Sequence, residues 1–293
     1  MREIRGCGTA LITPFDDNLE IDWDSLGTLV RRQLDASIDF LVPLGTTGET
    51  PCLEEEERER LIATIMELND SKVPVVAGVG ANSTKAVIKN ISILSRFNPD
   101  AFLVVVPYYN KPTQEGIFLH FKAVSESTST PIILYNIPGR TSINMSAETT
   151  LRLAELKNII AVKEACVNYE QVSEIIRLAP EGFSVFSGND DMIFPLMCTG
   201  AKGAISVASN IAPSPLVKMT ALLSEGRTKE AAVLHHRLMP LFKACFVETN
   251  PIPVKSALAL KGLIKNRLRL PLTGSTVQTD KLMESILEGL SDL

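Results

Sequence analysis

Eight short apolar segments recur over residues 1–226, and each is followed by a longer amphipathic segment. Most of the apolar segments are almost continuously hydrophobic, as strands buried on both faces of a parallel sheet are. The segments that follow carry apolar residues at helical spacing or open with acidic residues, as residues 22–37 and 54–68 do. This alternation predicts an α/β fold, the (β/α)8 TIM barrel. The expected strands are residues 6–15, 40–47, 73–80, 101–109, 131–138, 159–165, 183–188 and 203–209.

Residues 227–293 contain no strong strand pattern. Their apolar spacing predicts three helices, at residues 229–246, 254–265 and 279–289. Pro251 and Pro253 separate the first helix from the second. We therefore expect residues 1–226 to form the barrel and residues 227–293 to form a helical extension of it.

Charge and hydrophobicity argue against several classes of partner. The 293 residues include 29 Lys and Arg against 34 Asp and Glu, so the net charge is −5. No basic excess exists to neutralise phosphates, which argues against a nucleic-acid partner. No apolar run approaches the length of a membrane span, and we expect no membrane association.

Cysteine and histidine usage adds two expectations. The five cysteines are odd in number and widely spaced, which is typical of free thiols in a reducing compartment. The first residues lack the apolar stretch of a signal peptide, so we expect a cytoplasmic protein. There are only three histidines, and we expect no metal site. His120 is interpreted as a packed side chain and the pair His235 and His236 as lying on a solvated helix face.

Polar residues gather where the predicted strands end. In TIM barrels the catalytic groups come from the carboxyl ends of the strands, which share one rim. Glycines, hydroxyls, phenols and one lysine are found there. The residues that the strand ends deliver there include Thr46, Thr47, Tyr108, Tyr109, Tyr135, Lys163, Gly188, Asn189 and Ile205.

Lys163 is the sharpest feature of this rim. Strand alternation places Ala161, Lys163 and Ala165 on one face, and Ile160 and Val162 on the helix-facing side. Burial lowers a lysine pKa, and a neutral amine can attack a carbonyl to form a Schiff base. The alternative is a strand-end lysine paired with an acid. The small neighbours and the polar rim favour the nucleophile.

Further residues of the rim suit proton transfer and anion binding. Tyr135 and Tyr109 could carry protons with the Thr46 hydroxyl between them, although a strand-end tyrosine more often simply packs its ring. The turn at residues 45–48 could present backbone N–H groups to a small carboxylate, or could be an ordinary turn. Arg140 could bind a carboxylate through two hydrogen bonds, or could form a surface salt bridge. The acidic run at residues 54–57 is interpreted as a solvated helix start.

Four motifs then resemble the dihydrodipicolinate synthase family, within the superfamily of pyruvate-dependent lyases and aldolases. They are GTTGE at residues 45–49, VPYYNKP at 106–112, YNIPGRT at 135–141 and VKE at 162–164. The similarity extends over essentially the whole chain, including NPIPVK at 250–255. It implies condensation of pyruvate with L-aspartate 4-semialdehyde in the diaminopimelate and lysine pathway, without a metal or organic cofactor.

The resemblance also implies a role for each site residue. Lys163 would form the Schiff base, and Tyr135 and Thr46 would relay protons. Tyr109 would complete the relay from the neighbouring subunit of a tight dimer, within a homotetramer built as a dimer of dimers. Thr47 would hold the pyruvate carboxylate and Arg140 the carboxylate of the semialdehyde. Gly188, Asn189 and Ile205 would border the pocket.

Arg140 also bears on the alternatives. N-acetylneuraminate lyases and 2-keto-3-deoxy-sugar-acid aldolases share the lysine and the Tyr-Asn-x-Pro stretch, but by resemblance they typically lack this arginine. The arginine therefore favours the synthase over these relatives. A barrel that only binds a metabolite and regulates a partner is disfavoured by the complete set of Lys163, Tyr135, Thr46 and Tyr109.

A possible effector cleft follows from the same resemblance. Lysine-inhibited members bind lysine in a cleft at the dimer interface, with a histidine where Glu55 stands and a glutamate where Ala86 stands. Losing that glutamate removes a partner for the ammonium of the effector. We expect weak or absent inhibition by lysine. The matching cleft positions are Thr50, Pro51, Glu55, Asn82 and Tyr108.

Overall fold

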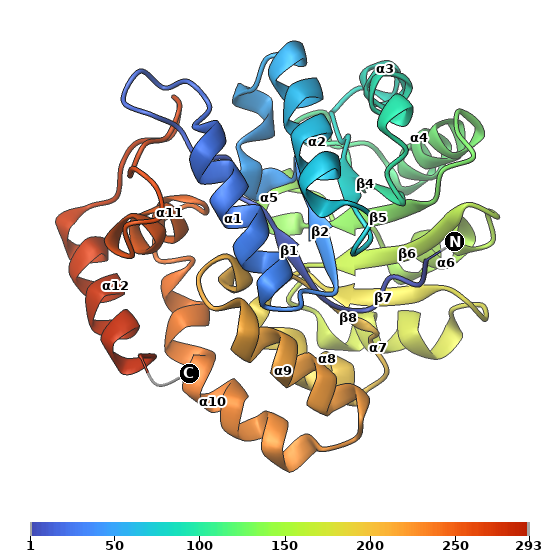
Figure 1. The fold of residues 1–293 in the computed structure, drawn as a ribbon. Helices are drawn as coiled ribbons and strands as arrows, with labels where there is room; N and C mark the ends of the chain where they lie inside the picture. The colour runs from blue at the N-terminus through green and yellow to red at the C-terminus, as the bar shows by residue number, and fades with distance from the viewer. Residues whose placement is uncertain (1, 292–293) are drawn as a thin grey trace.

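A closed barrel of eight parallel strands forms the centre of the molecule (Figure 1). The computed structural model describes residues 2–291. The strands follow the order β2-β1-β8-β7-β6-β5-β4-β3, and a parallel bridge from Leu41 to Val75 joins β2 to β3. The predicted TIM barrel is confirmed, with one strand inside each predicted segment. The strands are β1 (Gly6–Ala10), β2 (Phe40–Val42), β3 (Val76–Gly78), β4 (Ala101–Val105), β5 (Ile132–Asn136), β6 (Ile159–Glu164), β7 (Ser184–Ser187) and β8 (Gly203–Ser206).

Helices surround the barrel and lie between successive strands. Several begin at a side-chain cap: Thr113 accepts from the Gly116 N–H and Ser146 from the Thr149 N–H. Glu54 and Glu57 form a capping box at the start of α2. The helices of the barrel are α1 (Trp23–Asp35), α2 (Glu55–Asn69), α3 (Thr84–Leu94), α4 (Gln114–Glu126), α5 (Pro138–Thr141), α6 (Ala147–Ala154), α7 (Tyr169–Leu178), α8 (Ile193–Cys198) and α9 (Pro213–Ser224).

The barrel strands separate two apolar cores. One lies between the strands and the helices, and the other fills the barrel interior. Inside the barrel, Phe40 and Phe186 meet edge to face with ring centroids 5.6 Å apart. These apolar side chains fill the barrel interior. The barrel therefore has no pore through its centre, and a site is expected at the rim where the strands end.

Strand β6 departs from strict alternation at one residue. Ile132 pairs with Ile159 whereas Ile133 pairs with Ala161, so Ile160 is an extra residue in β6. Ile160 packs against the interior core, and its predicted helix-facing position is wrong. Beyond the irregularity the prediction holds: Val162 packs in the outer core and Ala161 in the inner one.

The C-terminal helices pack against the outside of the barrel (Figure 1). They are α10 (Thr228–Ala244), α11 (Ile252–Leu260) and α12 (Val277–Gly289), close to the predicted bounds. α10 packs on α9, and α11 packs on α12. The expectation that His235 lies on a solvated face is wrong, because its ring is buried 5.2 Å from that of Phe194. His120 is packed as expected and accepts from or donates to the Thr84 hydroxyl at 2.9 Å.

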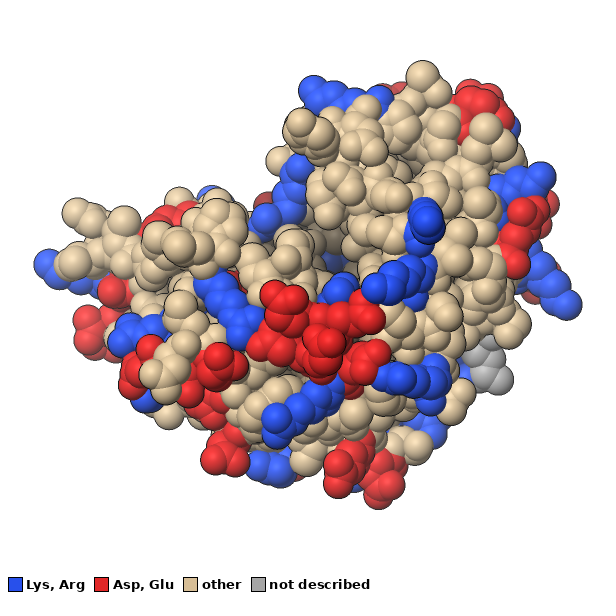
Figure 2. Space-filling model, turned by 90° about the horizontal axis from the view of Figure 1, so that it is seen from above, with Lys and Arg blue, Asp and Glu red and all other residues tan. Residues whose placement is uncertain are grey.

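The surface carries charges of both signs. Figure 2 shows acidic and basic side chains interspersed over the face it presents, without a continuous basic surface. Among residues 2–291, no helix combines the length and apolar character needed to cross a membrane. Cys7, Cys166 and Cys245 are buried free thiols, whereas Cys52 and Cys198 reach solvent.

Candidate active site

Lys163 lies in the barrel mouth, where the carboxyl end of β6 carries it. Its side chain is almost fully buried, and its Nζ lies 4.2 Å from the ring centroid of Tyr135, its neighbour on β5. Over the described part of the chain, no carboxylate lies within ion-pair distance of this nitrogen. Burial lowers the pKa of Lys163 to about 7; the charge of Asp190 opposes this, and that of Arg140 adds to it. A substantial fraction of the amine is therefore neutral near pH 7.

Asp190 is the acid whose charge acts to raise the pKa of Lys163, and it was not singled out from the sequence. It is buried, and its Oδ2 accepts from the backbone N–H groups of Val207 and Ala208 at 3.1 and 2.9 Å. Burial raises the pKa of Asp190, while these donors and Lys163 favour its charged form. Its position beside Asn189 in the sequence did not indicate that its side chain is buried.

Tyr135 is the second reactive group of the rim. Thr46 lines the same pocket, and its side chain acts to lower the pKa of this phenol. Burial raises the pKa of Tyr135 to about 12, although Arg140 and Thr46 both act to lower it. The phenol is therefore protonated at neutral pH and able to donate. Gly188 faces the lysine stem closely: a Cβ there would lie 3.1 Å from Lys163 Cε.

Asn250 links the two groups that are expected to bind carboxylates. Its side-chain Nδ2 donates to Thr47 Oγ1 at 2.9 Å, and its carbonyl accepts from Arg140 Nη2 at 3.0 Å. Asn250 comes from the C-terminal extension, just before α11, and is buried. Sequence reasoning assigned it no role. The only signal was its membership of the NPIPVK motif.

The pocket at the barrel mouth brings most of the expected residues together. Its lining includes Thr46, Thr47, Tyr135, Arg140, Lys163, Gly188, Asn189 and Asn250. Ile205 is fully buried in the barrel interior and is not part of this lining. Arg140 and Asn189 also border a cavity of about 700 Å³ that continues outward past Cys166 and Phe246. The pocket around Lys163 is thus the small inner part of a larger cavity that opens to the surface.

Tyr109 stands apart from the pocket. Its side chain is 87% exposed, and its backbone φ of 71° is in the left-handed region. It does not line the pocket around Lys163. Within one protomer, therefore, Tyr109 does not contact the reactive amine.

The expected effector cleft is a cavity of about 520 Å³ beside the site. Thr50, Pro51, Glu55 and Tyr108 line it, but Asn82 does not. Asn82 lies nearby, with its carbonyl accepting from Asn110 Nδ2 at 2.8 Å. Ala86 is also in the lining. Thr46, Tyr135 and Arg140 border this cavity as well as the pocket, so the two spaces share a wall.

One charged side chain of the cleft already has a partner. Glu55 forms an ion pair with Lys89, and the pKa of Glu55 is lowered first by this hydrogen bond. The Lys89 side chain is largely exposed to solvent, whereas that of Glu55 is partly buried. A cationic ligand in the cleft would have to compete with Lys89 for this carboxylate.

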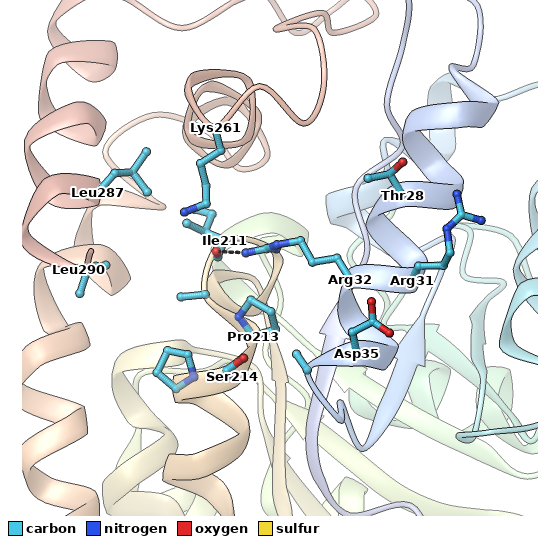
Figure 3. A pocket seen from close by; sticks show the side chains of 13 residues that line it. Thr28, Arg31, Arg32, Asp35, Ile211, Pro213, Ser214, Lys261, Leu287 and Leu290 are labelled. Atoms are coloured by element: carbon cyan, nitrogen blue, oxygen red, sulfur yellow. Dashed lines mark hydrogen bonds between the residues drawn. The ribbon is translucent and has the colours of Figure 1, made fainter. Parts of the chain in front are cut away.

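A third cavity, of about 570 Å³, lies outside the barrel between α1, α9, α11 and α12 (Figure 3). Arg31, Arg32 and Lys261 line it with Asp35. The Arg32 guanidinium donates to the Asn210 and Ile211 carbonyls at 2.6 and 2.5 Å. It thus fastens α1 to the loop after β8. None of the expected site residues lies here, and across residues 2–291 no three His, Cys, Asp or Glu side chains gather as metal ligands would.

Comparison with known proteins gives a consistent result. A model of the dihydrodipicolinate synthetase family matches residues 3–290. The 4-hydroxy-tetrahydrodipicolinate synthase of Thermotoga neapolitana is 46% identical over 287 residues, covering 97% of both chains. The enzyme of the same name from Phocaeicola vulgatus is 46% identical over 288 residues, covering 98% of this chain and 97% of that one.

Solved structures agree closely with this fold. The dihydrodipicolinate synthase of Thermotoga maritima superposes with a TM-score of 0.97 at 45% identity, covering 99% of each chain. The enzyme from Cyanidioschyzon merolae, solved with lysine bound, gives a TM-score of 0.95 at 38% identity, again covering 99% of each chain. This structural similarity includes the C-terminal extension, in which Asn250 lies between α10 and α11.

Proposed function

The chain belongs to the dihydrodipicolinate synthetase family, and from this premise we propose how its own residues perform the reaction. The protein is a lyase of the class I aldolase type. It condenses pyruvate with L-aspartate 4-semialdehyde to form 4-hydroxy-tetrahydrodipicolinate for diaminopimelate and lysine biosynthesis. The observation that carries this assignment to individual residues is the buried, carboxylate-free amine of Lys163 beside the Tyr135 ring.

Lys163 opens the reaction as the nucleophile. Its neutral amine attacks C2 of pyruvate, and loss of water gives an imine. Removal of a proton from the pyruvate methyl group gives an enamine, which attacks the aldehyde carbon of the second substrate. The amino group of that substrate then attacks the imine carbon, closes the ring and releases Lys163. One water is lost overall, and the imine serves as the electron sink, so no metal or organic cofactor takes part.

Tyr135 and Thr46 move the protons that these steps require. The phenol is protonated at neutral pH and lies in one pocket with Thr46, so it can donate a proton to the oxygen that leaves as water and take up a proton in a later step. Thr47 and the backbone of the turn at residues 45–48 hold the pyruvate carboxylate. Arg140 receives the carboxylate of the semialdehyde. Gly188 and Asn189 border the pocket, and Ile205 supports it from below.

Arg140 also separates this reaction from those of related aldolases. A sugar-acid substrate presents a neutral polyhydroxy chain, for which a guanidinium at this position offers no charge partner. Its placement in the same pocket as Lys163 favours the anionic semialdehyde. Turnover of N-acetylneuraminate or a 2-keto-3-deoxy sugar acid, without turnover of the semialdehyde, would support the alternative.

A substrate panel tests the assignment. Pyruvate is kept constant and the second aldehyde is varied, with consumption of each followed directly. We expect turnover of L-aspartate 4-semialdehyde at a kcat/KM far above that of every other aldehyde. Borohydride added with pyruvate should trap a reduced adduct on Lys163, detected by peptide mass. Absence of both turnover and adduct would contradict the proposal.

The exposed position of Tyr109 supports a proposal about the assembly. Because its ring projects into solvent, 87% exposed, we propose that it completes the proton relay of a second protomer. The expected assembly is a homotetramer, a dimer of two such dimers, in the cytoplasm, where five unpaired cysteines would stay reduced. Light scattering measures the mass. A fully active monomer would contradict the role of Tyr109.

We further propose that free lysine inhibits the enzyme weakly or not at all. Ala86 offers no charge to the effector ammonium, and Glu55 is already paired with Lys89. Lysine titrated into the initial-rate assay should leave the rate nearly unchanged up to millimolar concentrations. Inhibition at sub-millimolar lysine would show that other groups bind the ammonium.

A further inference from the structure

A second buried lysine lies behind the site and is paired with an acid. Lys255 and Glu49 form an ion pair in which neither side chain is exposed to solvent. Glu49 directly follows the turn at residues 45–48 and adopts a left-handed backbone conformation, with a φ of 52°. The position of this carboxylate is therefore coupled rigidly to the turn that holds Thr47.

Lys255 is equally constrained from the other side. Its Nζ donates to the Arg267 carbonyl at 2.9 Å and lies 4.1 Å from the ring centroid of Phe15. Lys255 sits in the first half of α11, whose start follows Asn250. Holding Lys255 therefore holds the residue that contacts both Thr47 and Arg140.

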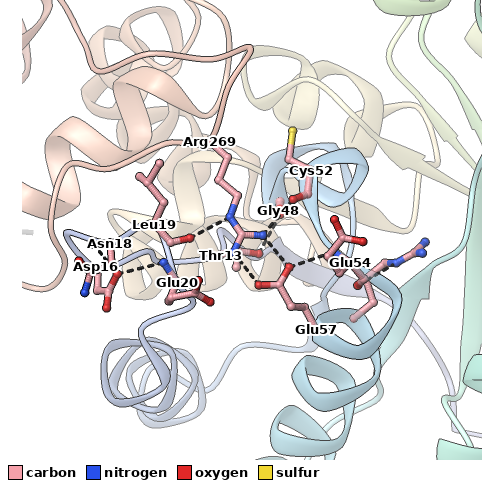
Figure 4. Close-up of polar contacts among 11 residues, drawn as sticks. Thr13, Asp16, Asn18, Leu19, Glu20, Gly48, Cys52, Glu54, Glu57 and Arg269 are labelled. Atoms are coloured by element: carbon pink, nitrogen blue, oxygen red, sulfur yellow. Dashed lines mark hydrogen bonds and ion pairs between the residues drawn. The ribbon is translucent and has the colours of Figure 1, made fainter.

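Arg269 contacts Glu49 and also binds residues of neighbouring segments, which Figure 4 shows around its guanidinium. Its backbone N–H donates to Glu49 Oε2 at 3.1 Å. Its guanidinium donates twice to Glu57, at 2.6 Å each, and once to the Leu19 carbonyl at 2.9 Å. The loops after β1 and β2 and the C-terminal segment are thus joined behind the carboxylate-binding turn.

We propose that the buried Glu49–Lys255 pair is a positioning device for both substrates: it fixes the start of α11 against the turn and so sets Asn250 between Thr47 and Arg140. A buried ion pair is no more stabilising than a well-packed apolar pair, because desolvation offsets the attraction. Its distinctive effect here is geometric, since each charge can be satisfied in only one arrangement. The inference rests on the proposed function, because it concerns the binding of the two carboxylate substrates.

The test uses the full-length enzyme carrying Glu49→Gln together with Lys255→Met. Removing both charges avoids leaving one of them buried and unpaired. We expect a folded protein whose KM values for pyruvate and for the semialdehyde both rise about tenfold, while kcat changes by less than about threefold. Borohydride trapping of pyruvate on Lys163 at saturating pyruvate should persist. Lys265→Met, in an exposed pair with Asp17, is the matched control and should leave both KM values unchanged.

The outcomes separate the two proposals. Wild-type enzyme without turnover of the two substrates would refute the proposed function. Active wild type together with a folded double variant whose KM values stay within about twofold would refute the positioning role. If the double variant does not fold, Glu49→Asp replaces it, since it keeps the charge but withdraws the carboxylate by one methylene. Unchanged KM values in that variant would likewise overturn the proposal.

Discussion

Among residues 2–291 two lysines are buried, Lys163 and Lys255, and they are surrounded in opposite ways. Lys163 lies over an aromatic ring in the barrel mouth, and no carboxylate of the described chain is at ion-pair distance from it. Lys255 also lies over an aromatic ring, but a carboxylate and a backbone carbonyl complete its shell. Burial lowers the pKa of Lys163 to about 7 and that of Lys255 to about 8, the latter against the opposing effect of Glu49.

The difference shows that burial alone does not decide what a lysine amine does. A buried lysine with room beside it and only a distant opposing charge becomes a nucleophile. A buried lysine that is paired and packed becomes a fixed point of the structure. Residue type and burial are therefore insufficient to identify a catalytic lysine, whereas the first contacts of its nitrogen distinguish the two roles.

The largest expected effect is the loss of chemistry on Lys163→Ala. Without the amine no imine forms, so kcat should fall by about 10⁴-fold or more. Borohydride with pyruvate should add no mass to the peptide that contains residue 163. The matched variant is Lys255→Met: provided it folds, it should still be labelled at Lys163. Labelling of Lys255 in the Lys163→Ala variant would reverse the comparison.

Stability should respond in the opposite sense at the two positions. Lys255→Met leaves Glu49 buried without its cation and should lower the free energy of unfolding by about 3–5 kcal/mol. Lys163→Met removes an amine that burial penalises when charged, so it should not destabilise the protein. The lysine is protonated in the unfolded chain up to about pH 10.5 but in the native state only below about pH 7. Its penalty is therefore complete below pH 7 and shrinks as the pH rises.

Denaturant titrations of both variants and the wild type, at pH 6 and pH 9, measure these changes. Lys163→Met should gain most over the wild type at the lower pH. A larger gain at the higher pH would mean that the native pKa of Lys163 is not lowered. Equal destabilisation by both methionine variants would remove the distinction between the two lysines.

A smaller effect is expected on the pH profile. The rate depends on neutral Lys163, so kcat/KM should rise with pH through about 7 and then level off. Asp190→Asn removes the charge that favours the protonated amine and should move this limb about one pH unit lower. The profile of initial rates from pH 5.5 to 9 measures the shift. If the rise in kcat/KM moved to higher pH instead, Asp190 would not be the group that favours the protonated amine.

The smallest effect is expected at a third lysine, which is exposed. Lys265 pairs with Asp17 at the surface, where both side chains are more than half exposed. Solvent screens such a pair, so Lys265→Met should leave the melting temperature and the rate unchanged within error. Differential scanning calorimetry is sufficient as a measurement. A clear loss of stability would show that the exposed Lys265–Asp17 pair stabilises the protein as a buried pair does.

Much of this architecture could be predicted because it depends on local patterns. Continuous apolar runs indicated all eight strands, and alternation in β6 correctly separated Val162 from Ala161. It was wrong for Ile160, because an irregular register in the pairing with β5 inserts one residue. Such a register depends on the neighbouring strand and leaves no mark in the strand itself.

The contacts behind the site could not be predicted, because they join residues about 200 positions apart. Asn250 contacts Thr47 across 203 residues, and Arg269 contacts Glu57 across 212. The acidic run containing Glu57 does start a helix, as interpreted, but its capping residue also binds a distant guanidinium that no local pattern indicates. The burial of His235 was likewise not predictable from α10 alone, because the Phe194 ring of α8 packs against it.

The dependence of the pocket on Asn250 also bears on how the protein is made. A ribosome synthesises from the N-terminus, so every strand of the barrel has been translated before this asparagine is added. A nascent product that ends before residue 250 can therefore contain Lys163 and Tyr135 and still lack the bridge between Thr47 and Arg140. If the proposed roles hold, such a product cannot bind both substrates until Asn250 has been added.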